Sequence, residues 1–372
     1  KGPVRRAPSR RRDANRPSAL DSLLEDGLDF EVSSLQIIGL HRTPNEIQDE
    51  NSIGLTTAGT RVRYSGKIGH IAANAVWNEL SNRLNRERPA LYKRFNFAGR
   101  RSINGSVDYS LRYRNLQLFG ETAINEKGGV ATLNGLLAEL DPRVGIAILH
   151  RYYDRRYYTL TGNAFGESTQ VGNESGLYVG MQANFGKGVR LSTYFDAFEF
   201  PWLSFRADAP ARGYEGFVKL DYNPNYFISA YTQYRFERKQ RNLSGNTTPI
   251  DQLINNDRHN LRFHFAYNVT SQLALRTRVE FAFYQDEDFT QGMLIYQDLV
   301  IKPKKIPLNL QIRLAYFDTD NFDTRIYAYE NDLLYVFSVL PYFGQGMRYY
   351  LNSSYRIIDH IRLWRRLSQT YF

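Results

Sequence analysis

The stretch Leu273–Phe283 alternates strictly between two kinds of side chain. Its odd positions are apolar or Thr, whereas its even positions are Ala, Arg, Arg, Glu and Ala. Because successive side chains of a strand point to opposite faces, one face is apolar and the other carries three charges in its middle. The same pattern recurs in four further segments: 107–113, 228–237, 261–268 and 308–316.

The lengths of these segments and of their connections favour a membrane barrel over a soluble sandwich. The longer of these segments run for roughly nine to twelve residues. A tilted membrane strand needs about 9–11 residues, whereas soluble strands cluster near about 5–6. Tight turns are predicted at 114–115, 141–143, 186–188, 223–225 and 268–272, and longer polar loops at about 79–100, 151–175, 198–214 and 238–259. Short turns on the periplasmic side and long loops outside are typical of outer-membrane barrels.

Composition is consistent with this fold class. The chain holds 27 Tyr and 23 Phe but no Cys, and its mean hydropathy is −0.50. No stretch approaches the roughly 18 consecutive apolar residues of a spanning helix. We therefore predict an all-β, transmembrane antiparallel barrel of the outer-membrane type with roughly 14–16 strands. The count stays open near 327–346, where 326–338 forms either one long bulged strand or two short ones.

The charges in the middle of the predicted strands are the most informative polar residues. Facing lipid at the bilayer midplane, each would cost several kcal/mol, so we predict that they face the lumen. Two interpretations remain open: a path for ions or solutes, and a salt-bridge lattice that stiffens the wall. The predicted lumenal residues are Arg235, Glu237, Arg262, Arg276, Arg278, Glu280 and Arg313.

The first 30 residues differ in composition from the rest. Seven basic residues and one acidic residue occupy the first twenty positions, and Pro3, Pro8 and Pro17 interrupt any regular element. Without aromatic residues among them to stack on bases, nucleic acid is not expected as a partner. We predict a basic loop or linker at 1–30 and the barrel at 31–372, incomplete at both ends.

The search for chemistry yields little. The chain contains no phosphate-binding loop, nucleophile elbow or zinc-protease motif, so we expect neither an enzyme nor a cofactor. A weak calcium candidate comprises Asp318, Asp320 and Asp323, although a solvated loop tip is the simpler interpretation. Phe200 and Trp202, in a predicted loop, are candidates for contacts with a partner because aromatic side chains often anchor interfaces.

Several segments resemble a family of Bacteroidota envelope proteins that join a helix-hairpin-helix module to an outer-membrane barrel. The similar segments are 33–44, 129–143, 162–167, 200–203, 208–210, 294–298, 317–320, 324–332 and 368–372. The resemblance covers residue 30 to the end, without the helix-hairpin-helix module. It also implies a closing strand after Phe372, so we expect this chain to be part of a longer protein. The family offers no catalytic residues to transfer.

These observations predict a non-enzymatic barrel in the bacterial outer membrane, in contact with its lipid. We expect it to be a subunit of an envelope complex for transport, secretion or outer-membrane protein assembly, with other envelope proteins as partners. A stand-alone porin-like diffusion channel with a basic lumen is the main alternative. A barrel-embedded hydrolase and a soluble β-rich binding module are the remaining hypotheses.

Overall fold

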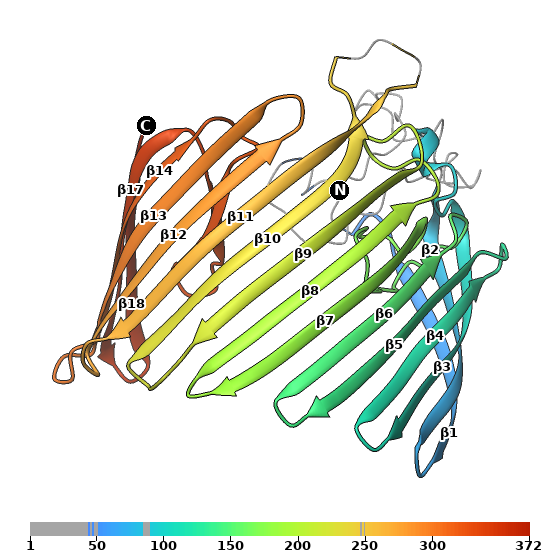
Figure 1. Ribbon diagram of the computed structural model, residues 1–372, viewed down its shortest axis with the longest axis horizontal. Coiled ribbons are helices and arrows are strands. Elements are labelled where there is room, and N and C mark those ends of the chain that lie inside the picture. The colour runs from blue at the N-terminus through green and yellow to red at the C-terminus, as the bar shows by residue number, and fades with distance from the viewer. Residues whose placement is uncertain (1–43, 45–46, 48–50, 85–89, 246–247, 249) are drawn as a thin grey trace, which may run out of the picture. The chain divides into compact units, whose positions relative to one another are not determined.

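The computed structural model describes residues 44, 47, 51–84, 90–245, 248 and 250–372. Within these residues, sixteen strands form one sheet in the order β1 to β14, then β17 and β18, while β15 and β16 pair separately (Figure 1). Every neighbouring pair with a defined register is antiparallel. The predicted basic segment 1–30 lies outside the described residues.

The strands are long. They are β1 (Leu55–Gly66), β2 (Gly69–Leu84), β3 (Gly99–Tyr113), β4 (Leu116–Asn125), β5 (Val130–Asp141), β6 (Val144–Tyr153), β7 (Glu174–Gly186), β8 (Val189–Phe200), β9 (Ala211–Tyr222), β10 (Ile228–Asn242), β11 (Leu253–Asn268), β12 (Leu273–Gln285), β13 (Phe289–Ile301), β14 (Leu308–Thr319), β15 (Ile326–Glu330), β16 (Ser338–Tyr342), β17 (Gln345–Ile358) and β18 (Ile361–Tyr371). A short 3-10 helix, η1 (Leu91–Lys93), precedes β3. Among the described residues, no helix is long and apolar enough to cross a membrane.

The predicted tight turns are confirmed, but all four predicted loops were drawn too long, most clearly the first and the last. β2 continues to Leu84 and β10 to Asn242, inside segments predicted as loops. The alternation of apolar and polar residues fades there while the hydrogen-bonded ladder continues. Arg238 and Asp257, for example, are register partners and form an ion pair of 2.5 Å. Such polar pairs extend a strand without an apolar face to reveal it in the sequence.

The chain divides into two compact units. Unit 1 comprises Lys1–Leu136, Leu149–Gly176 and Glu199–Pro210, and unit 2 comprises Leu137–Ile148, Leu177–Phe198 and Ala211–Phe372. Unit 1 contains β1 to β4 and the long connections after β6 and β8. Unit 2 contains β9 to β18.

The two faces of the sheet in unit 2 have the inverse of the burial found in a soluble protein. On β11, Phe263 and Phe265 are 45% and 46% exposed. On the opposite face of β12, Arg278 and Glu280 are only 7% and 3% exposed. Apolar side chains therefore cover the outward face, as required against lipid, and charged side chains are buried on the other face. We call these the apolar face and the polar face.

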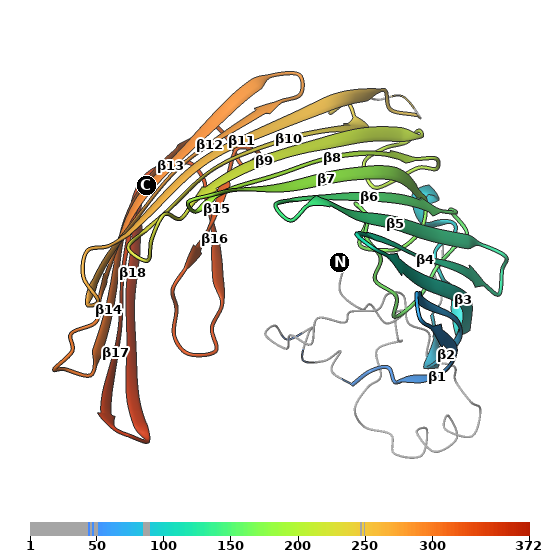
Figure 2. The same cartoon turned by 60° about the horizontal axis from the view of Figure 1, so that its bottom comes forward.

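A hairpin inserted between β14 and β17 covers part of the polar face. Its strands, β15 and β16, stand away from the main sheet (Figure 2). The region whose strand count the sequence left open thus forms two short strands. Ile326, Ala328 and Tyr342 of the hairpin pack against Leu294 and Phe317 of the sheet, in one buried cluster. An apolar core therefore lies on a face that is otherwise charged.

The apolar face predicts the response to a misplaced charge. Leu314 lies near the middle of β14 and is 53% exposed. We expect Leu314→Arg to lower the free energy of unfolding in lipid vesicles by about 2–4 kcal/mol, because a guanidinium at the midplane is poorly solvated. Urea titration followed by heat-modifiable gel mobility measures this. Leu314→Phe is the matched control, and an equal loss in both variants would contradict the assignment of the faces.

Candidate functional site

Ion pairs link adjacent strands along the polar face of unit 2. Arg262 of β11 bonds both carboxylate oxygens of Glu280 on β12, at 2.8 and 3.0 Å. Arg278, two residues before Glu280 on β12, contacts the same carboxylate. Arg313 of β14 bonds Asp298 of β13 in the same bidentate way, at 2.5 and 2.7 Å. Two-point pairing fixes the guanidinium plane, so these side chains are held in defined positions.

The three remaining charges predicted for the lumen lie at the margins of this lattice. Arg235 contacts Glu215 at 2.5 Å and Glu237 at 3.3 Å. Arg276 is exposed, although it is the register partner of Asp298. Within the described residues, no ion pair involves Arg276, because Asp298 is engaged by Arg313 instead. The lattice interpretation therefore fits six of the seven residues, and Arg276 stands apart.

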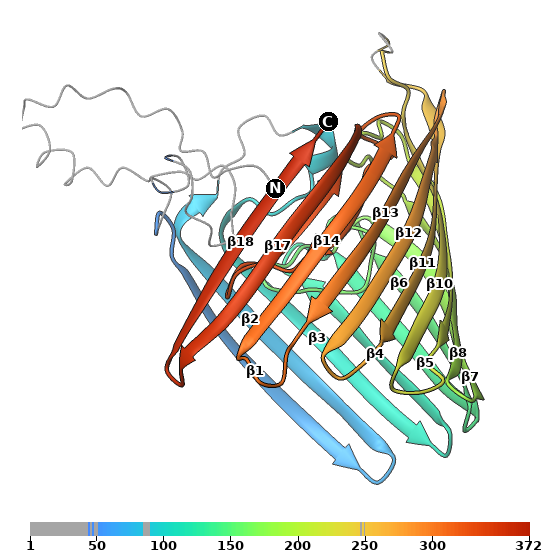
Figure 3. The same ribbon diagram turned by 90° about the vertical axis from the view of Figure 1, so that its left-hand side faces the viewer.

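One buried carboxylate joins the hairpin to the sheet. Glu330, at the end of β15, is fully buried. It accepts hydrogen bonds from Arg348 of β17 at 2.7 and 2.9 Å and from the Tyr342 hydroxyl at 2.6 Å. Arg366 of β18 contacts it from the other side. Figure 3 shows β14, β17 and β18 side by side. The two arginines that bind Glu330 come from two of these strands, β17 and β18.

Backbone carbonyls of the hairpin are also held by the lattice. Arg313 Nη1 donates to the Tyr329 carbonyl oxygen at 2.7 Å, and Arg278 Nη2 donates to that of Tyr327 at 3.3 Å. Asn352 of β17 donates to the Asp332 carbonyl oxygen at 2.9 Å. Two arginines of the ion-pair lattice, Arg278 and Arg313, therefore satisfy carbonyl groups at the edge of β15 that no further strand covers in the described part of the chain.

The surroundings of Glu330 oppose its protonation. Burial alone would raise its pKa, but hydrogen bonds from Arg348 and Tyr342 and the charges of Arg348 and Arg366 outweigh burial. The pKa of Glu330 is therefore below its ordinary value. Burial beside this carboxylate raises the pKa of Tyr342, which keeps the phenol protonated and donating.

The end of the hairpin is apolar and exposed. From Leu333 to Phe343 no charged residue occurs. Tyr335 is 97% exposed and Phe337 is 80% exposed. Tyr335 also has a φ of 68°, in the left-handed region that bulky residues rarely adopt, and such strain concentrates at functional sites. We call Leu333–Phe337 the hairpin tip.

The tip points toward the short turns. Glu330 bonds Arg348, whereas Asp332, two residues further along, bonds Asn352. The direction from Arg348 to Asn352 leads along β17 toward the turn at 359–360, which joins β17 to β18. Short turns are periplasmic in this class of barrel, so the tip is directed to that side.

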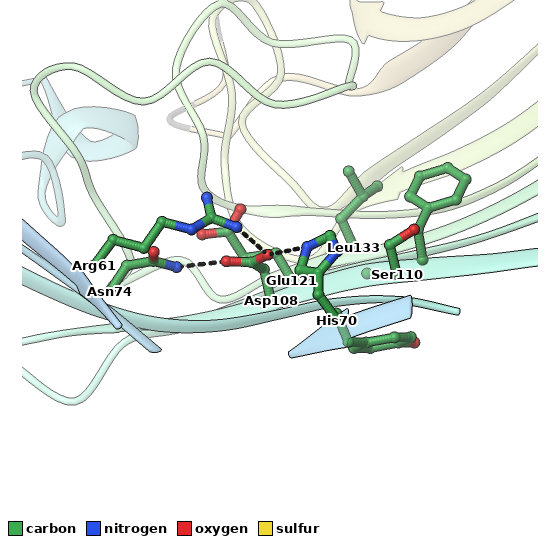
Figure 4. A pocket seen from close by; sticks show the side chains of 10 residues that line it. Arg61, His70, Asn74, Asp108, Ser110, Glu121 and Leu133 are labelled. Atoms are coloured by element: carbon green, nitrogen blue, oxygen red, sulfur yellow. Dashed lines mark hydrogen bonds and ion pairs between the residues drawn. The ribbon is translucent and has the colours of Figure 1, made fainter. Parts of the chain in front are cut away.

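Unit 1 has a separate pocket of about 360 Å³, lined by residues of β1 to β5. Figure 4 shows Asp108 at its centre. The Asp108 carboxylate accepts from Arg61 at 2.8 Å and from Asn74 at 2.7 Å, and it lies 3.1 Å from His70 Nε2. Ser110 also lines the pocket, but its hydroxyl accepts a hydrogen bond from Gln117 at 3.3 Å.

The two loop residues predicted as partner contacts differ in their surroundings. Phe200 ends β8 and is half-buried. Trp202 is engaged internally: its backbone N–H donates to Asn173 at 2.7 Å, and its ring lies 5.1 Å from the Arg155 guanidinium. The most exposed apolar side chain of this connection is Phe205, at 69%. A partner role for Phe200 and Trp202 stays a prediction.

The acidic loop does not form the weakly predicted calcium site. Among the described residues, no three acidic or His side chains are grouped to hold a metal ion. β14 continues to Thr319, so Asp318 lies on the same face as Tyr316. The Asp318 carboxylate accepts a hydrogen bond from the Tyr316 hydroxyl at 3.5 Å. Asp320, past the strand end, accepts from the backbone of Gln291 at 2.8 Å. Asp318 on the strand and Asp320 past its end are thus held by different partners.

Several important charged residues escaped the sequence-based prediction, Asp298 among them. Arg348 and Arg366 occur at alternating positions of the last two strands, so the pattern could have revealed them. Glu330 could not be found this way, because β15 belongs to a separate sheet. Glu174, in unit 1, forms a fully buried ion pair with Arg151 at 2.6 Å and accepts two backbone N–H groups of the loop after β6.

Comparison with known proteins supports the fold only. No family model and no curated protein matches the chain. The copper transporter OprC superposes with a TM-score of 0.52 at 11% identity, over 84% of this chain and 61% of that chain. The chain thus spans less than two thirds of OprC. The channel DcaP of Acinetobacter baumannii (TM-score 0.38, 10% identity, 85% of this chain and 97% of that chain) and OmpT of Vibrio cholerae (0.37, 8%, 84% and 96%) are also similar.

The chain has the fold of a bacterial outer-membrane β-barrel. The long antiparallel strands, the exposed apolar face and the OprC superposition all support this. The predicted fold class and the predicted outer-membrane localisation are therefore confirmed. The polar face of such a barrel is its lumenal face, so the hairpin lies on the lumenal side of the barrel wall.

Removing the charge of Glu330 tests the attachment of the hairpin. Glu330→Gln removes the anion that Arg348 binds and leaves Arg366 with Asp332 alone. Breaking a buried ion pair typically costs about 3–5 kcal/mol. We expect β15 and β16 to detach locally, so that proteases cleave the hairpin tip while the barrel keeps its heat-modifiable mobility. Glu287→Gln, at an exposed turn, is the control. Equal protection of the tip in both variants would refute the attachment.

The lowered pKa of Glu330 predicts how the hairpin responds to acid. A depressed pKa contributes stability that is complete above the unfolded value and is lost as pH falls through the folded value. We expect hydrogen exchange of β15 and β16 to accelerate below about pH 4, once corrected for intrinsic rates. In Glu330→Gln this pH dependence should disappear. Identical pH profiles of the two proteins would count against the role of Glu330.

Proposed function

We propose that this barrel is a non-enzymatic subunit of an envelope complex, and that a partner protein docks on the hairpin tip. The observation that carries the proposal is the exposure of an apolar tip on the lumenal side. Lipid covers the apolar face of the sheet, but the hairpin stands on the opposite, charged face. A surface of this kind favours a protein partner over lipid.

The attachment of the hairpin supports the same interpretation. Glu330 and the arginines around it attach β15 to the sheet, so the position of the tip is fixed before a partner binds. Preorganised surfaces lose less entropy on binding. The direction of the tip leads us to place the partner on the periplasmic side.

The chemistry of the tip defines the partner's contact surface. Leu333, Leu334 and Val336 are aliphatic, and Tyr335 and Phe337 add rings. Without a charge in the tip, the complementary surface should be an apolar groove or an apolar extended segment. Aromatic anchors commonly dominate such contacts, so we expect Phe337 and Tyr335 to carry most of the binding.

A diffusion channel remains the second candidate, and one observation favours it. Arg276 is exposed on the polar face without an ion pair in the described residues, so it is available to passing anions. Single-channel recordings in planar bilayers distinguish the candidates. Steady current that loses anion preference in Arg276→Glu would support the channel, whereas a folded, silent barrel would support the docking role.

The absence of catalysis is part of the proposal. His70 and Asp108 lie together, as in a hydrolase dyad, but the neighbouring Ser110 hydroxyl is engaged by Gln117. Among the residues that the structure describes, no base accepts a hydrogen bond from that hydroxyl, as activation of a nucleophile requires. Hydrolysis of lipid or peptide substrates that is lost in His70→Ala would overturn this part of the proposal.

Photocrosslinking in cells tests the docking role. A benzophenone amino acid at Phe337 should form an adduct with a periplasmic or outer-membrane protein, because the tip is buried in the complex. The matched control is Tyr226, which is 81% exposed beside a short turn but outside the hairpin. Adducts with lipid alone at Phe337, or the same protein adduct at both positions, would refute the proposal.

A second variant tests the chemistry of the same contact. Phe337→Asp places a charge in the apolar contact, so we expect the adduct formed by a benzophenone at Tyr335 to fall at least about tenfold. The barrel should still assemble, since the Phe337 side chain is 80% exposed and the substitution removes little buried surface. Unchanged crosslinking would mean that the partner does not bind the tip through an apolar surface.

A further inference from the structure

The pocket of unit 1 contains one carboxylate that is satisfied and one that is not. Asp108 accepts from Arg61 and Asn74 and lies within hydrogen-bonding distance of His70, and the Arg61 guanidinium balances its charge at 2.8 Å. Glu121 is the register partner of Asp108 on β4 and lines the same pocket. In the part of the chain that the structure describes, Glu121 forms no hydrogen bond or ion pair, and its side chain is exposed. The pocket therefore carries an unbalanced negative charge in a chain whose net charge is +10.

Beside Glu121 the pocket is apolar. Phe119 and Leu133 line it from β4 and β5. The ring of Phe119 lies directly over Gly135, where an added Cβ would come within 2.3 Å of the ring. A glycine at 135 is thus required for the ring to lie in this position. The aromatic wall is a fixed part of the pocket.

We propose that this pocket binds a small organic monocation, an ammonium group attached to an apolar body. The ammonium would pair with Glu121, and the apolar body would lie against Phe119 and Leu133. A cation near an aromatic ring gains further stabilisation from the ring quadrupole. A volume of about 360 Å³ is within the range of small-molecule sites, about 300–1,000 Å³. This inference is independent of the hairpin and of the proposed docking role.

The charges around the pocket select the class of ligand. Arg61 would attract an anion, but one of its N–H groups already binds Asp108 and its charge is compensated there. Glu121 has no such compensation. An uncharged ligand would fill the apolar part and leave the carboxylate to water. The cation alone uses both the free charge and the apolar wall.

Three probes of equal size and different charge test the inference: 4-fluorobenzylammonium, 4-fluorobenzyl alcohol and 4-fluorobenzoate. Each is titrated against the full chain in lipid nanodiscs and followed by fluorine NMR, with empty nanodiscs to subtract partitioning into lipid. We expect the ammonium to bind at least about tenfold more tightly than the alcohol, because a charge-assisted hydrogen bond is worth that much. The benzoate should bind more weakly than either.

Three variants locate the binding. Glu121→Gln should bring the affinity for the ammonium down to that for the alcohol, whereas Glu287→Gln, in an exposed turn of unit 2, should change nothing. Gly135→Ala keeps the carboxylate but displaces the Phe119 ring, so it should weaken both the ammonium and the alcohol. Equal binding of ammonium and alcohol by the unmodified chain would overturn the proposal. Tighter binding of the benzoate would overturn it too and assign the pocket to anions through Arg61.

Discussion

A charged side chain cannot face the hydrocarbon of a bilayer without a large cost, and the rest of this structure follows from that constraint. In the middle of the strands of unit 2 the charges lie on one face, as Arg276, Arg278 and Glu280 do on β12, so the two faces of the sheet differ there. The arginines and carboxylates gathered on the polar face must then be wetted or paired. In unit 2 most of them are paired, with Arg276 as an exception among the described residues, and Arg278 and Arg313 bind the backbone of the hairpin as well. The lattice that makes the wall compatible with lipid also determines where the hairpin lies.

Buried ion pairs contribute more to specificity than to stability, because desolvation offsets much of their attraction. The hairpin illustrates this division. Its apolar contacts with Leu294 and Phe317 supply the burial, while Glu330 fixes its position along the strands. The result is an apolar tip held on a charged surface. Unit 1 shows the same principle in its loops, where the buried pair of Arg151 and Glu174 anchors the connection after β6.

Most of the fold could be predicted from the sequence. Apolar and polar residues alternate strictly over long segments when the two faces of a strand meet different surroundings. Strand ends such as Arg238 to Asn242 were missed, since polar pairs extend a ladder without apolar alternation. The site was predicted less completely. Arg262, Arg278 and Glu280 were predicted from their place in the alternating pattern. Glu330 was not, because it lies on a hairpin outside the main sheet and binds arginines that are distant in the sequence. Membership of the Bacteroidota family stays a prediction.

The assignment of the two faces can be measured directly on β10. The chain has no cysteine, so a single cysteine can be introduced at a chosen position and spin-labelled. Labels at Ser229, Ala230, Tyr231, Thr232 and Gln233 in lipid vesicles would be exposed to oxygen, which concentrates in hydrocarbon, and to a nickel chelate, which stays in water. The account predicts high oxygen collision rates at Ala230 and Thr232 and high nickel rates at the other three. Collision rates without this two-residue period, or with the opposite phase, would contradict it.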